Sequence, residues 1–225
     1  MSGIYEAIGN TKIIRLTRSE SEFKTMEKIY AKAEYDNPSG SIKDRAAAAI
    51  IIEAEKSGAL YKGCTIVEAT SGNMGISLAM IGASRGYRVK IVMPKTASKE
   101  RQELIRAYGA EVILSHGDDG MRGALSFAEE IKKELPCSFM PRQFENSECM
   151  RCHYATTGPE IYRSLCGNVD CFVAGVGTGA GRGCGRRRAG MPSPPRCRSR
   201  TGWPRPGSPG RSVPPVPRRW PGNRR

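Results

Sequence analysis

The sequence lacks any apolar run long enough to cross a membrane and any start that resembles an export signal. Its longest apolar stretch, residues 46–52, is far shorter than the roughly 20 residues of a membrane-spanning helix. Residues 1–11 contain no basic segment followed by an apolar core, which a secretory signal requires. These absences predict a cytoplasmic protein without a membrane anchor.

Histidine is scarce, with 2 residues, whereas cysteine is present at 8 positions. Because no export signal is seen, we expect the cysteines to be reduced thiols rather than disulfides. Residues 149–153 spell C-x-x-C-H, but haem attachment to this pattern requires an exported chain. A zinc site would need two further ligands, and His116 is the only other histidine, so no metal is predicted.

Residues 180–225 contain no Lys, Asp, Glu, Leu, Ile or Phe, but 13 Arg and 10 Pro. The formal charge of the chain is +14 and the tail contributes +13, which leaves +1 for the first 179 residues. Such a composition cannot build a core and predicts disorder. Its arginines would attract nucleic acid without sequence preference, so a nucleic-acid-binding or scaffolding protein is an alternative of another class.

Over most of the first 179 residues, the apolar period alternates between that of a helix and that of a strand. The pattern predicts strands at residues 65–69, 88–93, 111–114 and 169–174, and helices at residues 42–57, 72–84, 98–108, 121–134 and 159–165. Ser41 is expected to cap the first of these helices and Gly58 to end it. The alternation predicts an α/β fold around a parallel sheet.

Three polar loops at element ends are candidates for a site: residues 37–45, 70–75 and 175–179. Lys43 lies in the first turn of a predicted helix, where exposed N–H groups and the helix dipole disfavour an added positive charge. This position suits a lysine that reacts with a carbonyl cofactor as a neutral amine. From the position alone, a solvated surface lysine remains the alternative.

The other two loops are suited to anions. Residues 70–73 follow a predicted strand and open a helix, so their N–H and hydroxyl groups can hold a carboxylate or simply cap the helix. Residues 175–179 can form a phosphate-binding nest or an ordinary tight turn. Residues 175–180 also fit the dinucleotide pattern G-x-G-x-x-A, but the helix and the acidic residue that should follow are missing.

Residues 37–45 (NPSGSIKDR) and 68–73 (EATSGN) resemble, in order and separation, the two best-known signatures of the cysteine synthase and cystathionine β-synthase family. The resemblance covers about residues 4–179 and includes the segments 93–94, 107–111, 143–144, 156–161 and 173–179. It implies the two-domain, tryptophan synthase β-like fold of type II pyridoxal-phosphate (PLP) enzymes. Residues 1–35 and 146–179 would be parts of a truncated larger cofactor domain, 36–145 the smaller α/β domain, and 180–225 an aberrant tail.

The resemblance also implies roles for individual residues. Lys43 would bind PLP covalently and move the proton at the α-carbon of the substrate. The substrate carboxylate would be held by Thr70, Ser71, Gly72, Asn73 and Gln143, with Asn73 also near the ring hydroxyl of the cofactor. The phosphate would be cradled by Gly175, Gly177, Thr178 and Gly179. The implied reaction is a β-replacement in which O-acetyl-L-serine loses acetate and sulfide adds to give L-cysteine, within a homodimer.

Three departures from the family pattern affect these expectations. Met74 stands where the family usually has Thr, and residues 146–150 replace an Asn-Pro-x-Asn-Pro run. After Gly179 the family pattern ends abruptly, and the following Arg, Pro, Gly and Ser are typical of a GC-rich gene translated in a shifted frame. We therefore expect a frameshifted chain with impaired cysteine synthase activity. Cystathionine β-synthase and serine/threonine dehydratase are the neighbouring alternatives.

Overall fold

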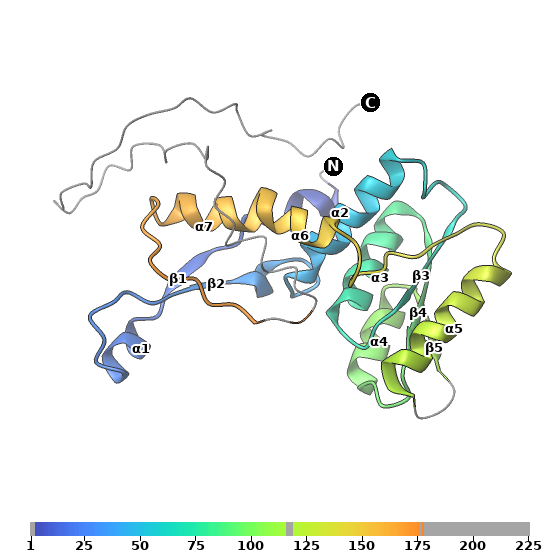
Figure 1. The fold of residues 1–225 in the computed structure, drawn as a ribbon, viewed down its shortest axis with the longest axis horizontal. Coiled ribbons are helices and arrows are strands. Elements are labelled where there is room, and N and C mark those ends of the chain that lie inside the picture. Colours follow the sequence, from blue (N-terminus) through green and yellow to red (C-terminus); the bar gives the residue numbers. More distant parts are fainter. Residues whose placement is uncertain (1–2, 116–118, 176, 178–225) are drawn as a thin grey trace.

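The computed structural model describes residues 3–115, 119–175 and 177 of the chain. Figure 1 shows a four-stranded sheet with its helices on one side of the molecule and an N-terminal two-stranded sheet on the other. Two long helical segments, one following residue 42 and one following residue 147, connect the two parts. The predicted tail, residues 180–225, and His116 lie outside the described residues.

The larger sheet consists of four parallel strands in the order β5-β4-β3-β6. The strands are β3 (Thr65–Ala69), β4 (Arg88–Met93), β5 (Glu111–Leu114) and β6 (Ser138–Phe139). The register pairs Ile66 with Val89 and Lys90 with Glu111. The first three strands have the bounds that the sequence predicts, whereas the two-residue β6 is too short to give a periodic signal.

Helices cover both faces of this sheet, as expected for parallel strands. They are α2 (Lys43–Lys56), α3 (Asn73–Arg85), α4 (Lys99–Ala107) and α5 (Gly120–Glu134). These four helices match the predictions for residues 42–57, 72–84, 98–108 and 121–134 to within one residue at each end. One core lies between the sheet, α2, α3 and α4, and a smaller one lies between the sheet and α5. Gly82 lets α3 approach β4, since a Cβ there would lie 2.2 Å from Val89 Cγ2.

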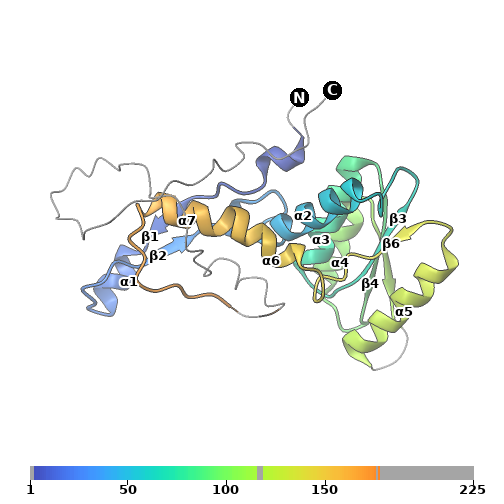
Figure 2. The ribbon, with the colours of Figure 1, turned by 45° about the horizontal axis from the view of Figure 1, so that its top comes forward.

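The secondary-structure elements of the N-terminal part were not predicted from the sequence. It comprises η1 (Ile4–Ala7), β1 (Ile13–Arg15), α1 (Thr17–Glu22), β2 (Tyr30–Lys32) and η2 (Glu34–Asp36). The strands β1 and β2 pair in antiparallel fashion. Figures 1 and 2 both show this pair beside the last helical segment and away from the large sheet.

The last helical segment contains α6 (Glu148–Cys152), a π-helical turn η3 (His153–Thr157) and α7 (Gly158–Ser164). Its first part packs on α2, and Figure 2 shows the three pieces as one continuous rod. The prediction of a helix near residues 159–165 is confirmed. The predicted strand at 169–174 is wrong: these residues form no ladder, and Val173 is 87% exposed. A strand requires a partner for its backbone N–H and C=O groups, and this segment pairs with none of the described strands.

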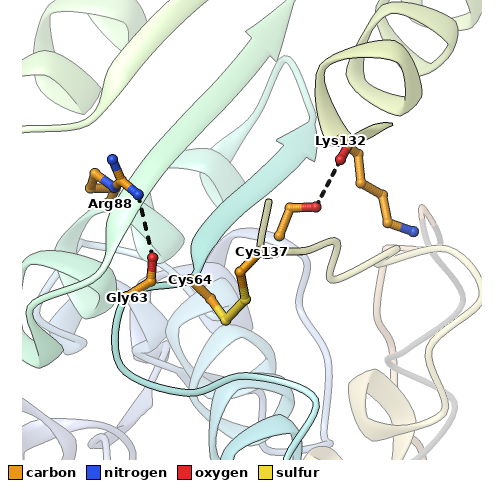
Figure 3. Close-up of a disulfide and its surroundings, with 6 residues drawn as sticks. Gly63, Cys64, Arg88, Lys132 and Cys137 are labelled. Atoms are coloured by element: carbon orange, nitrogen blue, oxygen red, sulfur yellow. Dashed lines mark hydrogen bonds between the residues drawn. A yellow bond between two sulfur atoms is a disulfide. The ribbon is translucent and has the colours of Figure 1, made fainter. Parts of the chain in front are cut away.

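Three described cysteines contradict the expectation of reduced thiols, because Cys64, Cys137 and Cys166 are disulfide-bonded. Cys64 and Cys137 form a disulfide with a Cα–Cα distance of 4.7 Å (Figure 3). Each residue directly precedes a strand, and the pairing of β3 with β6 places the two side by side, as the hydrogen bond of 3.0 Å from Thr65 N–H to the Cys137 carbonyl shows. Because the short β6 was not predicted, the proximity of Cys64 and Cys137 could not be expected from the sequence.

Candidate active site

Lys43 lies in the first turn of α2, as predicted; it is the first residue of the helix and is half-buried. The hydroxyl of Ser41 accepts a hydrogen bond of 3.2 Å from the Lys43 backbone N–H. Ser41 therefore satisfies one of the exposed donors at this helix end, although the helix begins one residue later than predicted. The amine is thereby carried by a helix whose first turn is fixed.

Asp44 connects the start of α2 to α3. Its carboxylate is fully buried and accepts hydrogen bonds from Ser39 N–H at 2.7 Å and from the Ser77 hydroxyl at 2.6 Å. The Ser39 hydroxyl donates to the same carboxylate. These contacts bring the loop before Lys43 and the first two turns of α3 together. The start of α2 is therefore joined to α3 by a hydrogen bond, which sequence spacing alone could not establish.

The loop that opens α3 follows β3 directly. Thr70 is buried, and its N–H donates to the Val92 carbonyl at 3.0 Å, which continues the sheet pairing. Its hydroxyl accepts a hydrogen bond of 3.2 Å from Gly72 N–H. Ser71 and Gly72 are half-buried, and Asn73 is exposed. Three of these four residues are therefore in part accessible, at a helix start whose N–H groups favour an anion.

Gln143 reaches this loop from the segment that follows β6. The side chain is buried, and its Nε2 donates a hydrogen bond of 3.2 Å to the Thr70 hydroxyl. The structure therefore brings together two predicted substrate-binding residues that are 73 positions apart in the sequence.

Sequence reasoning missed Glu68, which lies in β3 two residues before Thr70. Its carboxylate accepts hydrogen bonds from the N–H groups of Arg142 at 2.9 Å and Gln143 at 3.2 Å. Burial raises the pKa of this carboxyl to about 7, against the opposing effect of these two donors. A charged residue inside the otherwise apolar strand 65–69 was the signal that could have revealed it.

The residues of the C-x-x-C-H pattern form a buried cluster on α6 and η3. Cys149, Cys152 and His153 are all buried, and His153 Nδ1 lies 2.9 Å from the Thr157 hydroxyl. Burial raises the pKa of Cys149 to about 11 and lowers that of His153 to about 4, where the charges of Arg45 and Lys43 add to the effect. Among the described residues, no group of three or more His, Cys, Asp or Glu side chains could hold a metal ion.

The predicted phosphate-binding residues are only partly described. Gly175 and Gly177 are exposed, and a Cβ on either would meet no atom within 4 Å. Thr178 and Gly179 lie outside the described residues. The cradle formed by these four residues stays a prediction.

The start of α2, which carries Lys43, is hydrogen-bonded to α3 through Asp44 and Ser77, and Gln143 contacts Thr70 in the loop that opens α3. The chain belongs to the family of pyridoxal-phosphate dependent enzymes, whose model matches residues 4–189. It is 47% identical over 177 residues to a probable cysteine synthase of Bacillus subtilis, a match that covers 77% of this chain and 56% of that protein.

Solved structures give the same result. The cysteine synthase of Entamoeba histolytica has a TM-score of 0.77 at 40% identity, over 82% of this chain and 55% of that one. A hydrogen sulfide-producing enzyme of Fusobacterium nucleatum has a TM-score of 0.75 at 44% identity, over 82% and 61%. The fold is therefore that of type II PLP enzymes, and the chain spans little more than half the length of the relatives it matches. Within its described part, no helix is long and apolar enough to cross a membrane.

The residues present fit one side of a PLP molecule. A half-buried amine at the start of α2 is of the kind that binds the cofactor carbonyl. The loop opening α3 leaves space beside Gly72, where a Cβ would meet no atom within 4 Å. Met74 is buried in the hydrophobic core, so its side chain does not replace the hydrogen bond that the usual Thr would provide.

Proposed function

We propose that this site performs a PLP-dependent β-replacement that makes L-cysteine from O-acetyl-L-serine and sulfide. When bound, PLP supplies an electron sink for carbanion chemistry. Lys43 would hold the cofactor and move the proton at the α-carbon of the substrate. The observation that supports the proposal is the hydrogen bond from Ser77 to Asp44, which joins the residue after Lys43 to α3, in a chain of the PLP family.

The start of α3 suits the substrate carboxylate. Thr70, Ser71, Gly72 and Asn73 would offer N–H, hydroxyl and amide donors at a helix N-terminus, where negative charge is stabilised. The amide of Gln143 would complete this set, since it already contacts Thr70. Asn73, whose side chain is exposed, would also lie near the ring hydroxyl of the cofactor.

We infer that activity is impaired. Gly175, Gly177, Thr178 and Gly179 would hold the phosphate, but the residues after them lack the apolar pattern from which further strands of a larger domain could form. Phe172 is 43% and Val173 87% exposed, although both are apolar residues of the segment before these glycines. A homodimer, a cytoplasmic location, the frameshift, the domain bounds and nucleic-acid binding by residues 180–225 all stay predictions.

The cofactor step is tested by adding PLP to the purified chain and recording the visible absorption band of lysine-bound cofactor. We expect a band in the wild type that Lys43→Ala abolishes. The control is Lys56→Ala, at the exposed end of the same helix, which should keep the band. A band that survives Lys43→Ala would contradict the assigned role of this lysine.

The reaction is tested by supplying O-acetyl-L-serine with sulfide and measuring cysteine. We expect slow but Lys43-dependent product formation. If no cysteine forms, cystathionine formed from serine and homocysteine would favour the cystathionine β-synthase alternative. A keto acid formed from serine or threonine would favour the dehydratase alternative. Salt-sensitive binding to nucleic acid that is lost with residues 180–225 would support the alternative of another class.

A further inference from the structure

A single carboxyl group is buried in the middle of the parallel sheet. Glu68 is 2% exposed, and its neighbours in β3, Val67 and Ala69, are fully buried apolar residues. Burying a carboxylate is costly unless it is hydrogen-bonded. The partners of Glu68 therefore indicate why a charged residue occupies this position.

The partners are two successive backbone N–H groups. Arg142 N–H donates to Oε2 at 2.9 Å, and Gln143 N–H donates to Oε1 at 3.2 Å. Arg142 has a φ of 52°, a left-handed conformation that is unusual for a residue other than glycine. Successive N–H groups around such a residue form a concave site for an anion, and here the anion is the side chain of Glu68.

The same contact fixes the position of the Gln143 side chain. Gln143 Nε2 lies 3.2 Å from the hydroxyl of Thr70, which follows Glu68 by two residues. We propose that Glu68 is a positioning residue, whose carboxylate holds the backbone at 142–143 so that the Gln143 amide stays at the substrate-carboxylate site. The proposal rests on the proposed function, because it concerns the same site.

The protonation state of Glu68 should control this arrangement. An ionised carboxylate accepts both N–H groups, whereas a protonated one turns an O–H toward one of the donors. Burial raises its pKa to about 7, and the charged or titratable groups that act on it are the Arg142 guanidinium and, on α6, the Cys149 thiol. The hold on residues 142–143 should weaken as the pH falls below 7.

Amide hydrogen exchange on the full chain tests the contact without any cofactor. We expect Glu68→Gln to accelerate amide exchange at Arg142 and Gln143 about tenfold or more. A tenfold change corresponds to a loss of roughly 1.4 kcal/mol in the free energy of local opening of this segment. The matched control is Glu129→Gln, because Glu129 pairs with the guanidinium of Arg142 and not with its backbone. Equal exchange in both variants would overturn the proposal.

The wild type provides a second measurement if Glu68→Gln does not fold. Protection of the Arg142 and Gln143 amides should fall up to about tenfold between pH 8 and pH 6, after correction for intrinsic exchange, because a carboxyl group with a pKa of about 7 goes from about one tenth to about nine tenths protonated over this interval. The Thr65 amide, which donates a hydrogen bond to the Cys137 carbonyl between β3 and β6, should keep its protection. Constant protection at all three amides would refute a role for Glu68 ionisation.

Ligand binding separates positioning from general stability. In the PLP-loaded chain, Glu68→Gln should weaken O-acetyl-L-serine binding about tenfold, leave PLP binding unchanged and remove the pH dependence of the Kd near pH 7. Equal weakening of both ligands, or none, would overturn the positioning role. If the wild type binds no PLP, the proposed function fails, and the exchange experiment alone decides whether Glu68 holds this segment.

Discussion

Removal of the Arg45 guanidinium should destabilise the whole described part of the chain. Arg45 follows Asp44 in α2 and is 2% exposed. Its guanidinium pairs with Glu34 at 2.8 Å and with Glu160 at 2.7 Å. It therefore connects the N-terminal part, α2 and α7, which are far apart in the sequence.

The size of the effect follows from what would be left behind. In Arg45→Met the side-chain volume is kept, but the two largely buried carboxylates of Glu34 and Glu160 lose their main cation. Among the described cations, Lys32 alone stays paired with them, 2.8 Å from Glu160 and 4.0 Å from Glu34. Breaking a buried ion pair on one side costs about 3–5 kcal/mol. With an m-value of about 2 kcal/mol/M in urea, we expect the unfolding midpoint to fall by about 2 M.

Urea unfolding followed by circular dichroism measures this shift, and two further variants define it. Arg45→Lys keeps the positive charge without the forked geometry of the guanidinium, and should lower the unfolding midpoint less than Arg45→Met does. Arg15→Met removes the exposed pair with Glu20 and should leave the midpoint unchanged. A midpoint in Arg45→Met within error of that in Arg15→Met would refute the reasoning.

Acid provides an independent check of the same mechanism. Burial alone would raise the pKa of Glu160, but hydrogen bonds from Arg45 and Lys32 hold it down at about 2. A carboxylate with a lowered pKa contributes stability above its unfolded value near 4.5 and loses it as the pH falls toward 2. The deficit of Arg45→Met should therefore shrink below pH 4.5, because a protonated Glu160 no longer needs a cation.

Two more predictions concern the buried histidine and the disulfide. Burial lowers the pKa of His153 to about 4, so its contribution to stability, about 3 kcal/mol, is present above pH 6.5 and is lost as the pH falls through 4. Urea unfolding at pH 7.5 and 4.5 measures this loss, and His153→Gln should remove it. Glu68, whose pKa is raised, affects stability in the opposite direction, but equally in the wild type and the variant. The Cys64–Cys137 disulfide closes a loop with a sequence separation of 73, so its reduction should lower the free energy of unfolding by about 4 kcal/mol through the entropy of the unfolded chain. Dithiothreitol should therefore lower the Tm of the wild type, and an unchanged Tm would contradict the disulfide.

Local pattern was sufficient for the elements whose burial is local. The strands β3, β4 and β5 are short apolar runs between Gly-ended helices, and each has the bounds that its apolar residues predict. Helices α2 to α5 follow in the same way, because their apolar residues recur at the helical period. A glycine also follows α2, α3 and α4 within two residues of the helix end. The pairs that make the site are different in kind, since Gln143 meets Thr70 only through the placement of β6 beside β3.

The failed strand at 169–174 shows where local pattern is insufficient. Its residues have the β-branched, apolar character of a buried strand, yet Phe172 and Val173 are exposed and the segment pairs with nothing described. A strand in a parallel sheet gains its stability from neighbours on both sides, so these residues can form a strand only when a sheet lies beside them.

The two halves of the proposed site differ for the same reason. Lys43 and the start of α3 rest on a sheet and core that are present, whereas Gly175 and Gly177 follow a segment that has no sheet to hold it. We therefore expect the carboxylate side of the site to form independently of the phosphate side, and affinity for PLP, rather than the position of Lys43, to be what limits activity.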